Sequence, residues 1–453
     1  MREHVATFLL LLVAAFSVAI FISYKGSGTT SPVLTFLIAP ATTSAPATPG
    51  ADLNIVSNAP KTERKKGDGK RKLEKMEDGL ARSRAAIRRA IMERNFTSRK
   101  RQSFVPRGPI YHNPYAFHQS YIEMEKRLKI WVYKEGEPPL FHDGIFRGLY
   151  SVDGHFIDQM DHYSPFVTND PDNALIFFLP FSVERLVKLV HQKGTYYQSI
   201  QTVMRDYVQL ISSKYPYWNR TNGADHFLLS CHDWAPYVTK DQDPFKNLVR
   251  VMCNANTTEG FNPRRDVSLP EFNIPFYLPV PVRNPSPPSS KTLLAFFAGA
   301  NHGSVRKFLF EQWNRKDQQI QLFEHLPKGL NYTEFMMKSK YCLCPSGYEV
   351  ASPRITEAII SGCVPVPISD GYVLPFSDVL DWTQFSVPIP VPRIPEIKEI
   401  LSAIPESTYL KLQANVMKVQ RHFMINRPAR RFDVMHMLLH SIWLRRLDVR
   451  LTQ

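Results

Sequence analysis

The sequence predicts an α/β protein of two Rossmann-like, doubly wound halves that face a cleft, preceded by a membrane anchor and a stem. Short apolar strands alternate with amphipathic helical stretches over residues 129–230 and again, after a proline-rich passage at 275–288, over residues 293–368. Such alternation is typical of parallel sheets covered by helices on both faces. With 453 residues, the chain also has room for two domains of ordinary size and an N-terminal tail.

An apolar run without a charged residue, Val5–Ile22, lies near the N-terminus. The apolar core of a secretory signal is about 7–15 residues long, whereas a membrane span needs roughly 17–25. The run therefore favours a signal anchor within residues 1–25, although Ala and Ser near its end leave cleavage open. We expect a short cytoplasmic tip, one transmembrane helix and a luminal chain, which is the type II topology.

The stem is expected over residues 26–107 and has two parts. Residues 26–60 are rich in Thr, Ser, Pro and Ala and are typical of a flexible segment. Residues 61–107 hold 17 Lys/Arg against 6 Asp/Glu, so most of the net charge of +15 belongs to the stem and does not indicate nucleic-acid binding. Apolar residues at helical spacing predict an amphipathic helix there, either solvated or able to pair with another chain: Leu73, Met76, Leu80, Ile87 and Ile91.

Sequons and cysteines fit a chain in the secretory pathway. The sequons predict N-glycosylation at Asn95, Asn219, Asn256 and Asn331. Five cysteines can supply disulfides, but their odd number leaves at least one unpaired within the chain: Cys231, Cys253, Cys342, Cys344 and Cys363. Cys342 and Cys344 are two apart on an expected strand, which favours buried thiols over a metal site.

The two halves are predicted at residues 108–285 and 286–453. In the first half, strands are expected at 129–133, 174–181 and 226–230, and helices at 183–192 and 196–213. In the second half, we expect a strand at 293–298, a turn at 299–303, a helix at 305–313 and strands at 341–344 and 363–368. A helix between the last two strands begins near Ser352-Pro353 and ends at Gly362, because Ser, Pro and Gly are the usual residues at these positions.

The stretch from Tyr341 to Asp370 therefore forms a strand, a glycine-bearing loop, a helix and a second strand. The loop and the start of the helix make a natural anion site, because unpaired amides and the helix dipole point outward there. Arg354 and Glu357 lie one turn apart on one helical face, where they can meet a diphosphate and the hydroxyls of a ribose. The alternative is an ordinary surface ion pair.

Residues 344–382, CPSGYEVASPRITEAIISGCVPVPISDGYVLPFSDVLDW, resemble the signature of the exostosin glycosyltransferases, in particular the plant branch of glycosyltransferase family 47. The resemblance extends over residues 130–451. It implies the GT-B architecture, in which the two Rossmann-like halves are a donor and an acceptor domain. It also implies a nucleotide-sugar donor and a leaving diphosphate held by basic side chains rather than by an essential metal. The acid pairs Asp170/Asp172 and Asp241/Asp243 lie in Pro-flanked turns and are interpreted as turn residues.

Donor-binding residues are carried over from the family onto two loops. Residues 297–306, FAGANHGSVR, resemble its diphosphate loop, with Gly299 and His302 in the turn and Arg306 near a helix start. A plain strand-to-helix turn is the alternative. Glu349 and Glu357 are eight residues apart, as in the paired glutamates of GT-B enzymes, and Ser346 lies in the same loop. A surface position is the alternative for Glu349.

A catalytic base is expected where polar residues follow the strand at 226–230. His232 and Asp233 are the first candidates to remove a proton from an acceptor hydroxyl. Asp153 and His155 come next, and ordinary capping or backbone hydrogen bonding is the alternative for all four residues. Residues 266–270, DVSLP, also resemble a family segment and are expected to shape the floor of the cleft.

The chain departs from the family at two positions. Leu175 and Ser304 stand where relatives commonly have histidine and proline. Neither position is assigned to chemistry, but residue 175 is expected to lie near the cleft, where the loss of a polar side chain indicates a divergent acceptor or a weakened enzyme.

The sequence thus predicts a Golgi type II membrane glycosyltransferase that moves a sugar, with inversion, from a UDP-sugar to a cell-wall polysaccharide or glycan. The competing hypothesis is a catalytically silent partner or glycan-binding scaffold of an active relative. The stem leaves pairing with a like or unlike chain open in either case, and no nucleic acid is expected as a partner.

Overall fold

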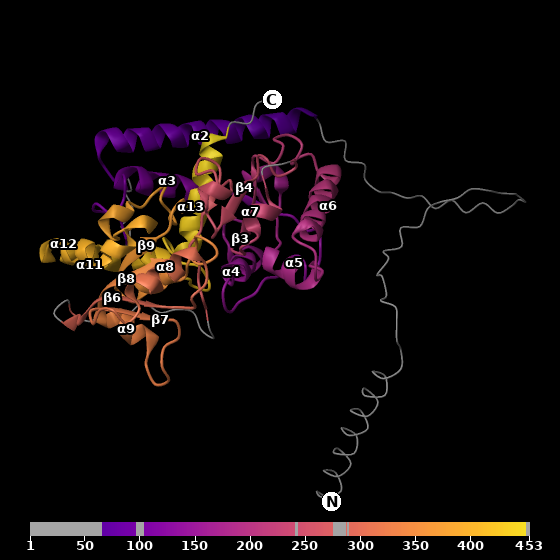
Figure 1. Ribbon diagram of the computed structural model, residues 1–453. Coiled ribbons are helices and arrows are strands. Elements are labelled where there is room, and N and C mark those ends of the chain that lie inside the picture. The colour runs from indigo at the N-terminus through magenta and orange to yellow at the C-terminus, as the bar shows by residue number, and fades with distance from the viewer. Residues whose placement is uncertain (1–65, 97–103, 241–242, 275–286, 288–289, 450–453) are drawn as a thin grey trace, which may run out of the picture. The chain divides into compact units, whose positions relative to one another are not determined.

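A computed structural model describes residues 66–96, 104–240, 243–274, 287 and 290–449, all within one compact unit that comprises residues 64–453 (Figure 1). The anchor predicted at residues 5–22 and the Thr/Ser-rich part of the stem lie outside these residues. Within the described ranges, no helix is both long and apolar enough to cross a membrane.

The first half contains, among the described residues, a five-stranded sheet in the order β1-β2-β3-β4-β5, with every pair parallel. Its strands are β1 (Ile130–Val132), β2 (Ile176–Phe178), β3 (His226–Ser230), β4 (Val249–Met252) and β5 (Val267–Ser268). The connections include α4 (Val152–Asp158), η1 (Gln159–Tyr163), η2 (Pro171–Asn173), α5 (Val183–Val190), α6 (Gln198–Lys214), α7 (Ala235–Val238) and η3 (Thr257–Glu259).

The second half contains, in the part of the chain described, a four-stranded parallel sheet in the order β7-β6-β8-β9. Its strands are β6 (Leu293–Ala298), β7 (Ile320–Phe323), β8 (Ser339–Pro345) and β9 (Val364–Ile368). Its helices and turns are α8 (Ser304–Trp313), α9 (Tyr332–Lys338), α10 (Arg354–Ile360), η5 (Trp382–Gln384), η6 (Val391–Glu396), α11 (Ile397–Ser402), α12 (Glu406–Val419) and η7 (Gln420–Phe423). Two parallel α/β halves confirm the predicted GT-B class.

Local signals placed the second-half elements correctly. Strand β6 coincides with the expected 293–298, and α10 starts at Arg354, one residue after Pro353 at its N-cap. Gly362 follows the helix with φ +67°, a left-handed conformation that glycine adopts without steric cost. The amide of Ser346 donates to the carbonyl of Ile368, which joins the loop after β8 to the end of β9.

Helices from both ends of the chain cover the first half. The last helix, α13 (Val434–Asp448), packs on α3 (Pro114–Arg127) and β5, so the chain returns from the second half to the first. Arg446 on α13 is buried, donates to the carbonyl of Leu175 and forms an ion pair with Glu77 at 2.7 Å. Leu175 precedes β2 and so lies at the edge of the sheet opposite the strand ends that form the cleft; the expectation that it lies near the cleft was wrong.

The helix predicted in the stem is α2 (Lys66–Glu93), and it packs on the folded domain (Figure 1). Leu80 is completely buried, and the hydroxyl of Ser83 donates to the carboxylate of Glu123 on α3. The interpretation as a solvated helix was therefore wrong for its apolar face, which contacts the chain's own α3. Ile91, at the end of that face, is 40% exposed.

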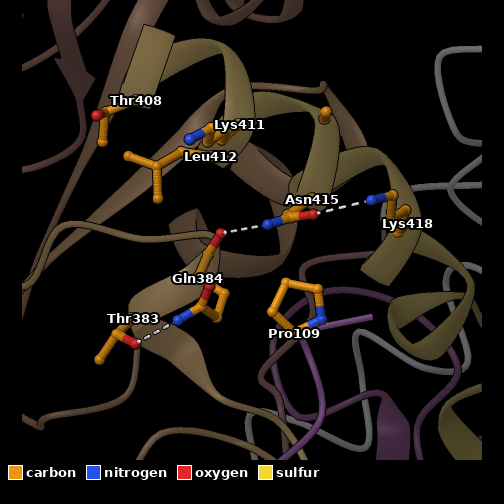
Figure 2. Close-up of a pocket in the computed structure, with 9 residues that line it drawn as sticks. Pro109, Thr383, Gln384, Thr408, Lys411, Leu412, Asn415 and Lys418 are labelled. Carbon is orange, nitrogen blue, oxygen red and sulfur yellow. Dashed lines mark hydrogen bonds between the residues drawn. The ribbon is translucent and has the colours of Figure 1, made fainter. Parts of the chain in front are cut away.

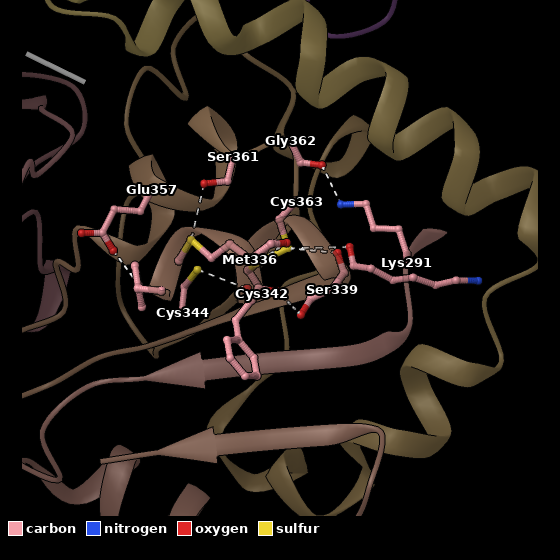
Figure 3. The surroundings of a disulfide bond; sticks show 12 residues. Lys291, Met336, Ser339, Cys342, Cys344, Glu357, Ser361, Gly362 and Cys363 are labelled. Carbon is pink, nitrogen blue, oxygen red and sulfur yellow. Dashed lines mark hydrogen bonds between the residues drawn. A yellow bond between two sulfur atoms is a disulfide. The ribbon is translucent and has the colours of Figure 1, made fainter. Parts of the chain in front are cut away.

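Two disulfides and one free cysteine account for the five cysteines. Cys231 after β3 bonds to Cys253 after β4, and Cys342 on β8 bonds to Cys363 beside β9, as Figure 3 shows. Cys344 is buried as a free thiol. The prediction of a buried thiol holds for Cys344 but not for Cys342.

Candidate functional site

A cavity of about 260 Å³ lies between the two halves, where the carboxyl ends of the strands meet. The first half contributes Leu149, Tyr150, Asp233, Glu271 and Asn273. The second half contributes Ala300, His302, Arg306, Gly347, Tyr348, Glu349, Ala351, Pro353 and Arg354. The two loops that were expected to share the cleft, 299–306 and 345–357, both line it.

Arg306 reaches the cavity from the first turn of α8 and is only 4% exposed. One terminal nitrogen donates to the carbonyl of Ala300 at 3.1 Å and lies 3.1 Å from Nε2 of His302. Its Nε is buried without a hydrogen-bond partner. A buried donor of this kind is costly unless a ligand accepts its hydrogen bond.

Arg354 enters the same cavity from the start of α10. Its guanidinium donates to the carbonyl of Ala298 at 3.3 and 3.4 Å. Within the described residues, neither Arg354 nor Arg306 has a carboxylate oxygen within 4.0 Å, so the surface ion pair with Glu357 does not form. Glu357 instead accepts the hydroxyl of Tyr332 at 2.7 Å.

The two guanidinium groups destabilise one another in the absence of an anion. Burial first, and then the charge of Arg354, lower the pKa of Arg306 to about 10. Burial by itself would lower the pKa of Arg354 as well, but the nearby Glu357 and Tyr332 raise it. Both side chains therefore stay cationic at neutral pH, and a bound anion would relieve their repulsion.

Glycines let the two loops pack directly on each other. Gly303 has φ +79°, and a Cβ there would lie 2.0 Å from the carbonyl oxygen of Gly347. A Cβ on Gly299 would lie 3.0 Å from Arg354. These glycines belong to the segment that resembles the diphosphate loop of the family. In the structure, Gly303 lets its loop approach the loop of Gly347, and Gly299 lets its loop approach Arg354. Beside them, the exposed ring of Tyr348 stacks on His302 with centroids 5.0 Å apart.

Three carboxyl groups also line the cavity. Burial raises the pKa of Asp233, although the nearby hydroxyl of Tyr150 acts to lower it. Burial, followed by the charge of Asp233, raises the pKa of Glu271 to about 8. Burial and the charge of Glu259 raise the pKa of Glu349 to about 7, while Asn254 of the first half donates to its carboxylate.

His232 does not line the cavity, although it adjoins Asp233. Its Nδ1 accepts the backbone amide of Trp234 at 2.9 Å, and its Nε2 lies 3.4 Å from the carboxylate of Glu184. Burial lowers its pKa to about 4, so the ring is neutral at pH 7. With Nδ1 already accepting, no free basic nitrogen points at the cavity.

Asp153 and His155 lie behind the cavity on α4. Asp153 is fully buried and accepts the amide of Cys231 at 2.9 Å and the hydroxyl of Ser182 at 3.1 Å. Burial raises its pKa to about 8. These contacts hold the loop that carries Asp233, which is a positioning role.

Comparison with known proteins identifies the family. The "Exostosin GT47 domain" matches residues 124–404, more than half of the chain. The chain belongs to the exostosin GT47 family. The family resemblance of residues 344–382 is therefore confirmed, and this GT47 chain is a member of a glycosyltransferase family.

Relatives of this GT47 chain carry glycosyltransferase names. "Probable glycosyltransferase At5g03795" of Arabidopsis thaliana is 50% identical over 406 residues, which cover 89% of this chain and 78% of the relative. "Probable beta-1,4-xylosyltransferase IRX10" of the same plant is 28% identical over 300 residues, covering 62% and 72%. The solved structure of TarM is 11% identical with a TM-score of 0.28, and the match covers 67% of this chain and 54% of that one.

The structure of the GT47 chain brings five predicted site residues together at the cavity: Asp233, His302, Arg306, Glu349 and Arg354. Gly299, Ser346 and Glu357 belong to the same loops and helix but are not among the residues that line it. The segment at 266–270 shapes the first half through an ion pair of Asp266 with the buried Arg250.

Glu271 and Tyr150 line the cavity of the GT47 chain and were not predicted. Glu271 comes three residues after the end of β5, at the same sheet edge as Asp233. The rule that selected Asp233 would have selected Glu271 if β5, only two residues long, had been recognised as a strand. Tyr150 has φ +65° in a turn, and no sequence signal indicates its position.

Predicted glycosylation positions differ in exposure. Asn95, Asn219 and Asn331 are exposed. Asn256 is only 8% exposed, and its side-chain oxygen accepts the amide of Thr258 at the start of η3. Asn256 is therefore the least accessible of the four predicted positions, and glycosylation there stays a prediction.

A separate cavity of about 370 Å³ lies on the surface of the second half of the GT47 chain (Figure 2). The carbonyl of Gln384 accepts from Asn415, and the oxygen of Asn415 accepts from Lys418, so these polar groups satisfy one another. This cavity includes no residue of the two loops and no carboxylate. Lys411 lines this surface cavity and lies outside the two loops.

Proposed function

We propose that this chain transfers a sugar, with inversion, from a UDP-sugar to a hydroxyl of a cell-wall polysaccharide or other glycan. The observation that supports this most is the pair of arginines in one cavity, the buried Arg306 and the half-buried Arg354, without a carboxylate oxygen within 4.0 Å among the described residues. A diphosphate between them would accept a hydrogen bond from the unpartnered Nε–H of Arg306 and would neutralise the charges of both guanidinium groups. Preorganised cations of this kind stabilise the negative charge that develops on a leaving diphosphate, and we propose that no essential metal is needed.

Asp233 is the proposed base. It lines the same cavity as the arginines, and a raised pKa makes its carboxylate a stronger base. In the proposed single displacement, Asp233 takes the proton of the acceptor hydroxyl as its oxygen bonds to the anomeric carbon. The bond from that carbon to the diphosphate breaks on the opposite face, and its electron pair leaves with UDP between Arg306 and Arg354.

The proposed setting is the Golgi lumen, with the chain held as a type II membrane protein by residues 1–25. The apolar run at 5–22 supports this, as do the two disulfides, because disulfides persist in oxidising compartments. The printed names of relatives, a xylosyltransferase and "Probable glucuronosyltransferase GUT1" of Oryza sativa, support sugar transfer as the reaction class. They do not agree on the sugar.

Binding of UDP to the protein tests the proposal. Residues 64–453, made in a secretory host, should be stabilised by UDP, since a ligand at 100 times its Kd adds about 2.7 kcal/mol to the free energy of unfolding. Arg354→Ala should weaken UDP binding at least tenfold in calorimetry, because a charged hydrogen bond is worth about 1.5–3 kcal/mol. Lys411→Ala, which removes a cation from the separate surface cavity, is the matched control and should bind UDP normally.

The opposite results have clear meanings. A cooperatively folded protein that binds no nucleotide would favour the silent partner or glycan-binding scaffold. An Arg354→Ala protein that binds UDP undiminished would contradict the assignment of the donor site.

A further inference from the structure

We infer that the donor carries an uncharged sugar, a hexose or pentose without a carboxylate, and that the cavity discriminates against uronic acid donors. This inference rests on the proposed function, since it concerns the sugar attached to the proposed diphosphate. The reason is the distribution of charge around the cavity.

The two cations of the cavity lie close to each other and to Glu271. Among the residues that line the cavity, the cations are Arg306 and Arg354, which donate to carbonyls in the loop after β6 and at the end of β6, respectively. Burial, Arg306 and Arg354 lower the pKa of His302, so this ring adds no charge at neutral pH. A bound diphosphate would use both cations, leaving none for a second anion.

The remainder of the cavity is acidic. Asp233, Glu271 and Glu349 line it, and Glu259 lies close enough to raise the pKa of Asp233 and of Glu349. Glu184 also acts on Asp233, and its nearest cation, Lys188, is already paired with it at 2.6 Å. Once a diphosphate occupies both arginines, no further cation lines the cavity beside these carboxyl groups, so a sugar near Asp233 meets an acidic surface.

A uronate would add one more carboxylate to this region. The cavity already resists negative charge, since its own carboxyl groups hold protons more tightly than ordinary ones. At neutral pH, a proton on Glu271 and partial protonation of Glu349 reduce this charge, whereas Asp233 still lines the cavity. Above about pH 8, the carboxylates of Glu271 and Glu349 add to the repulsion. Neutral hydroxyls have no such penalty, because carboxylates accept their hydrogen bonds.

Three donors isolate the effect of the carboxylate. UDP-glucose and UDP-glucuronate differ only in C6, which is a hydroxymethyl group in the first and a carboxylate in the second, and UDP-xylose has no C6. We expect UDP-glucose and UDP-xylose to bind residues 64–453 at least as tightly as UDP does. We expect UDP-glucuronate to bind at least tenfold more weakly than UDP.

Charge-neutral variants separate repulsion from poor fit. Glu349→Gln and Glu271→Gln keep the shape of the side chain. At about pH 9, where both carboxyl groups are charged in the wild type, each variant should raise the ratio of UDP-glucuronate to UDP affinity several-fold. Glu311→Gln, an exposed position on α8, should leave the ratio unchanged. Ratios are taken within each variant, so a general change in UDP affinity does not affect the result.

Each outcome decides the matter. UDP-glucuronate binding as tightly as UDP-glucose would overturn this inference while leaving the donor site intact. Weak UDP-glucuronate binding with a ratio that neither Gln variant changes would overturn the electrostatic explanation. Failure of UDP itself to bind would overturn the proposed function and this inference together.

Discussion

Asp233 and His232 show how adjacent residues at the end of one strand take different roles. Successive side chains after β3 point in different directions, so Asp233 lines the cavity while His232 contacts Trp234 and Glu184. Both residues carry a group able to act as a base, so residue type alone does not distinguish them. The directions of their side chains in the structure distinguish them.

Asp233→Asn tests the assignment of the base. We expect kcat to fall about 10²- to 10⁴-fold, the usual contribution of a general base, while UDP affinity stays near that of the wild type. His232→Gln should lower kcat far less, because its ring has no free nitrogen at the cavity. Transfer kinetics with a glycan acceptor measure both, and an active Asp233→Asn with an inactive His232→Gln would reverse the assignment.

At the same scale, the sequence predicted the second-half residues of the cavity better than those of the first half. Arg306, Arg354 and Glu349 lie on loops whose strands and helices have strong local signals, including glycine at a positive φ and proline at a helix start. Glu271 follows a strand of only two residues, too short for a periodic pattern. The burial of Asn256 depends on contacts with Gly371, over a hundred residues away, which a sequon does not encode.

At the scale of elements, α2 is the helix whose role changed most between sequence and structure. The apolar residues at helical spacing were recognised, and a highly charged helix remained compatible with solvent on all sides. Its attachment comes from residues distant in the sequence, such as Glu123 on α3 and Arg446 on α13. The helix belongs to the folded domain and covers it.

Leu80→Ala tests the packing of α2. The side chain is fully buried, so its loss should lower the free energy of unfolding by about 2–4 kcal/mol, as a core cavity does. Ile91→Ala, on the same face of the helix but 40% exposed, should cost about 1 kcal/mol or less. Urea unfolding measures both, and equal losses would show that α2 does not pack on the domain in solution.

Buried histidines join η7 to Tyr111, which precedes α3, and α13 to α3 itself, and they make stability depend on pH. His422 contacts the hydroxyl of Tyr111 at 2.8 Å, and His440 contacts the hydroxyl of Ser120 at 3.0 Å. Burial lowers the pKa of His422 to about 3 and that of His440 to about 4, as it does for His436. At these three histidines, the unfolded chain therefore binds more protons than the native chain below about pH 6.5.

Because protons bind these histidines more tightly in the unfolded chain, the free energy of unfolding should fall as the pH falls from about 6.5 toward 4. Each ring should contribute up to about 1.4 kcal/mol per pH unit. Acids with raised pKa values, such as Asp153, oppose this trend, so the comparison must be between variants. His440→Gln should have a shallower pH dependence of the unfolding free energy than the wild type. The exposed His162→Gln should match the wild type, and parallel curves for both variants would contradict the prediction.

At the scale of the whole molecule, the alternation of strands and helices was sufficient to predict two doubly wound halves. It did not reveal every strand, because β4 contains the buried Arg250, whose charge interrupts the apolar pattern and is balanced by Asp266. It also did not reveal that α13 crosses back to the first half. Both features depend on pairs of residues that are close only in the folded chain.

The disulfide between Cys231 and Cys253 links the loop that carries Asp233, which lines the cavity, to the loop that carries Asn254, which donates to Glu349. Its presence is decided once, when the chain is made, by the compartment in which it folds. A preparation from a reducing host would thus mix molecules with linked and unlinked loops. The kcat measured on such a mixture would depend on the fraction of molecules that carry the disulfide as well as on the rate of each molecule. The free thiols should therefore be counted before kcat is measured.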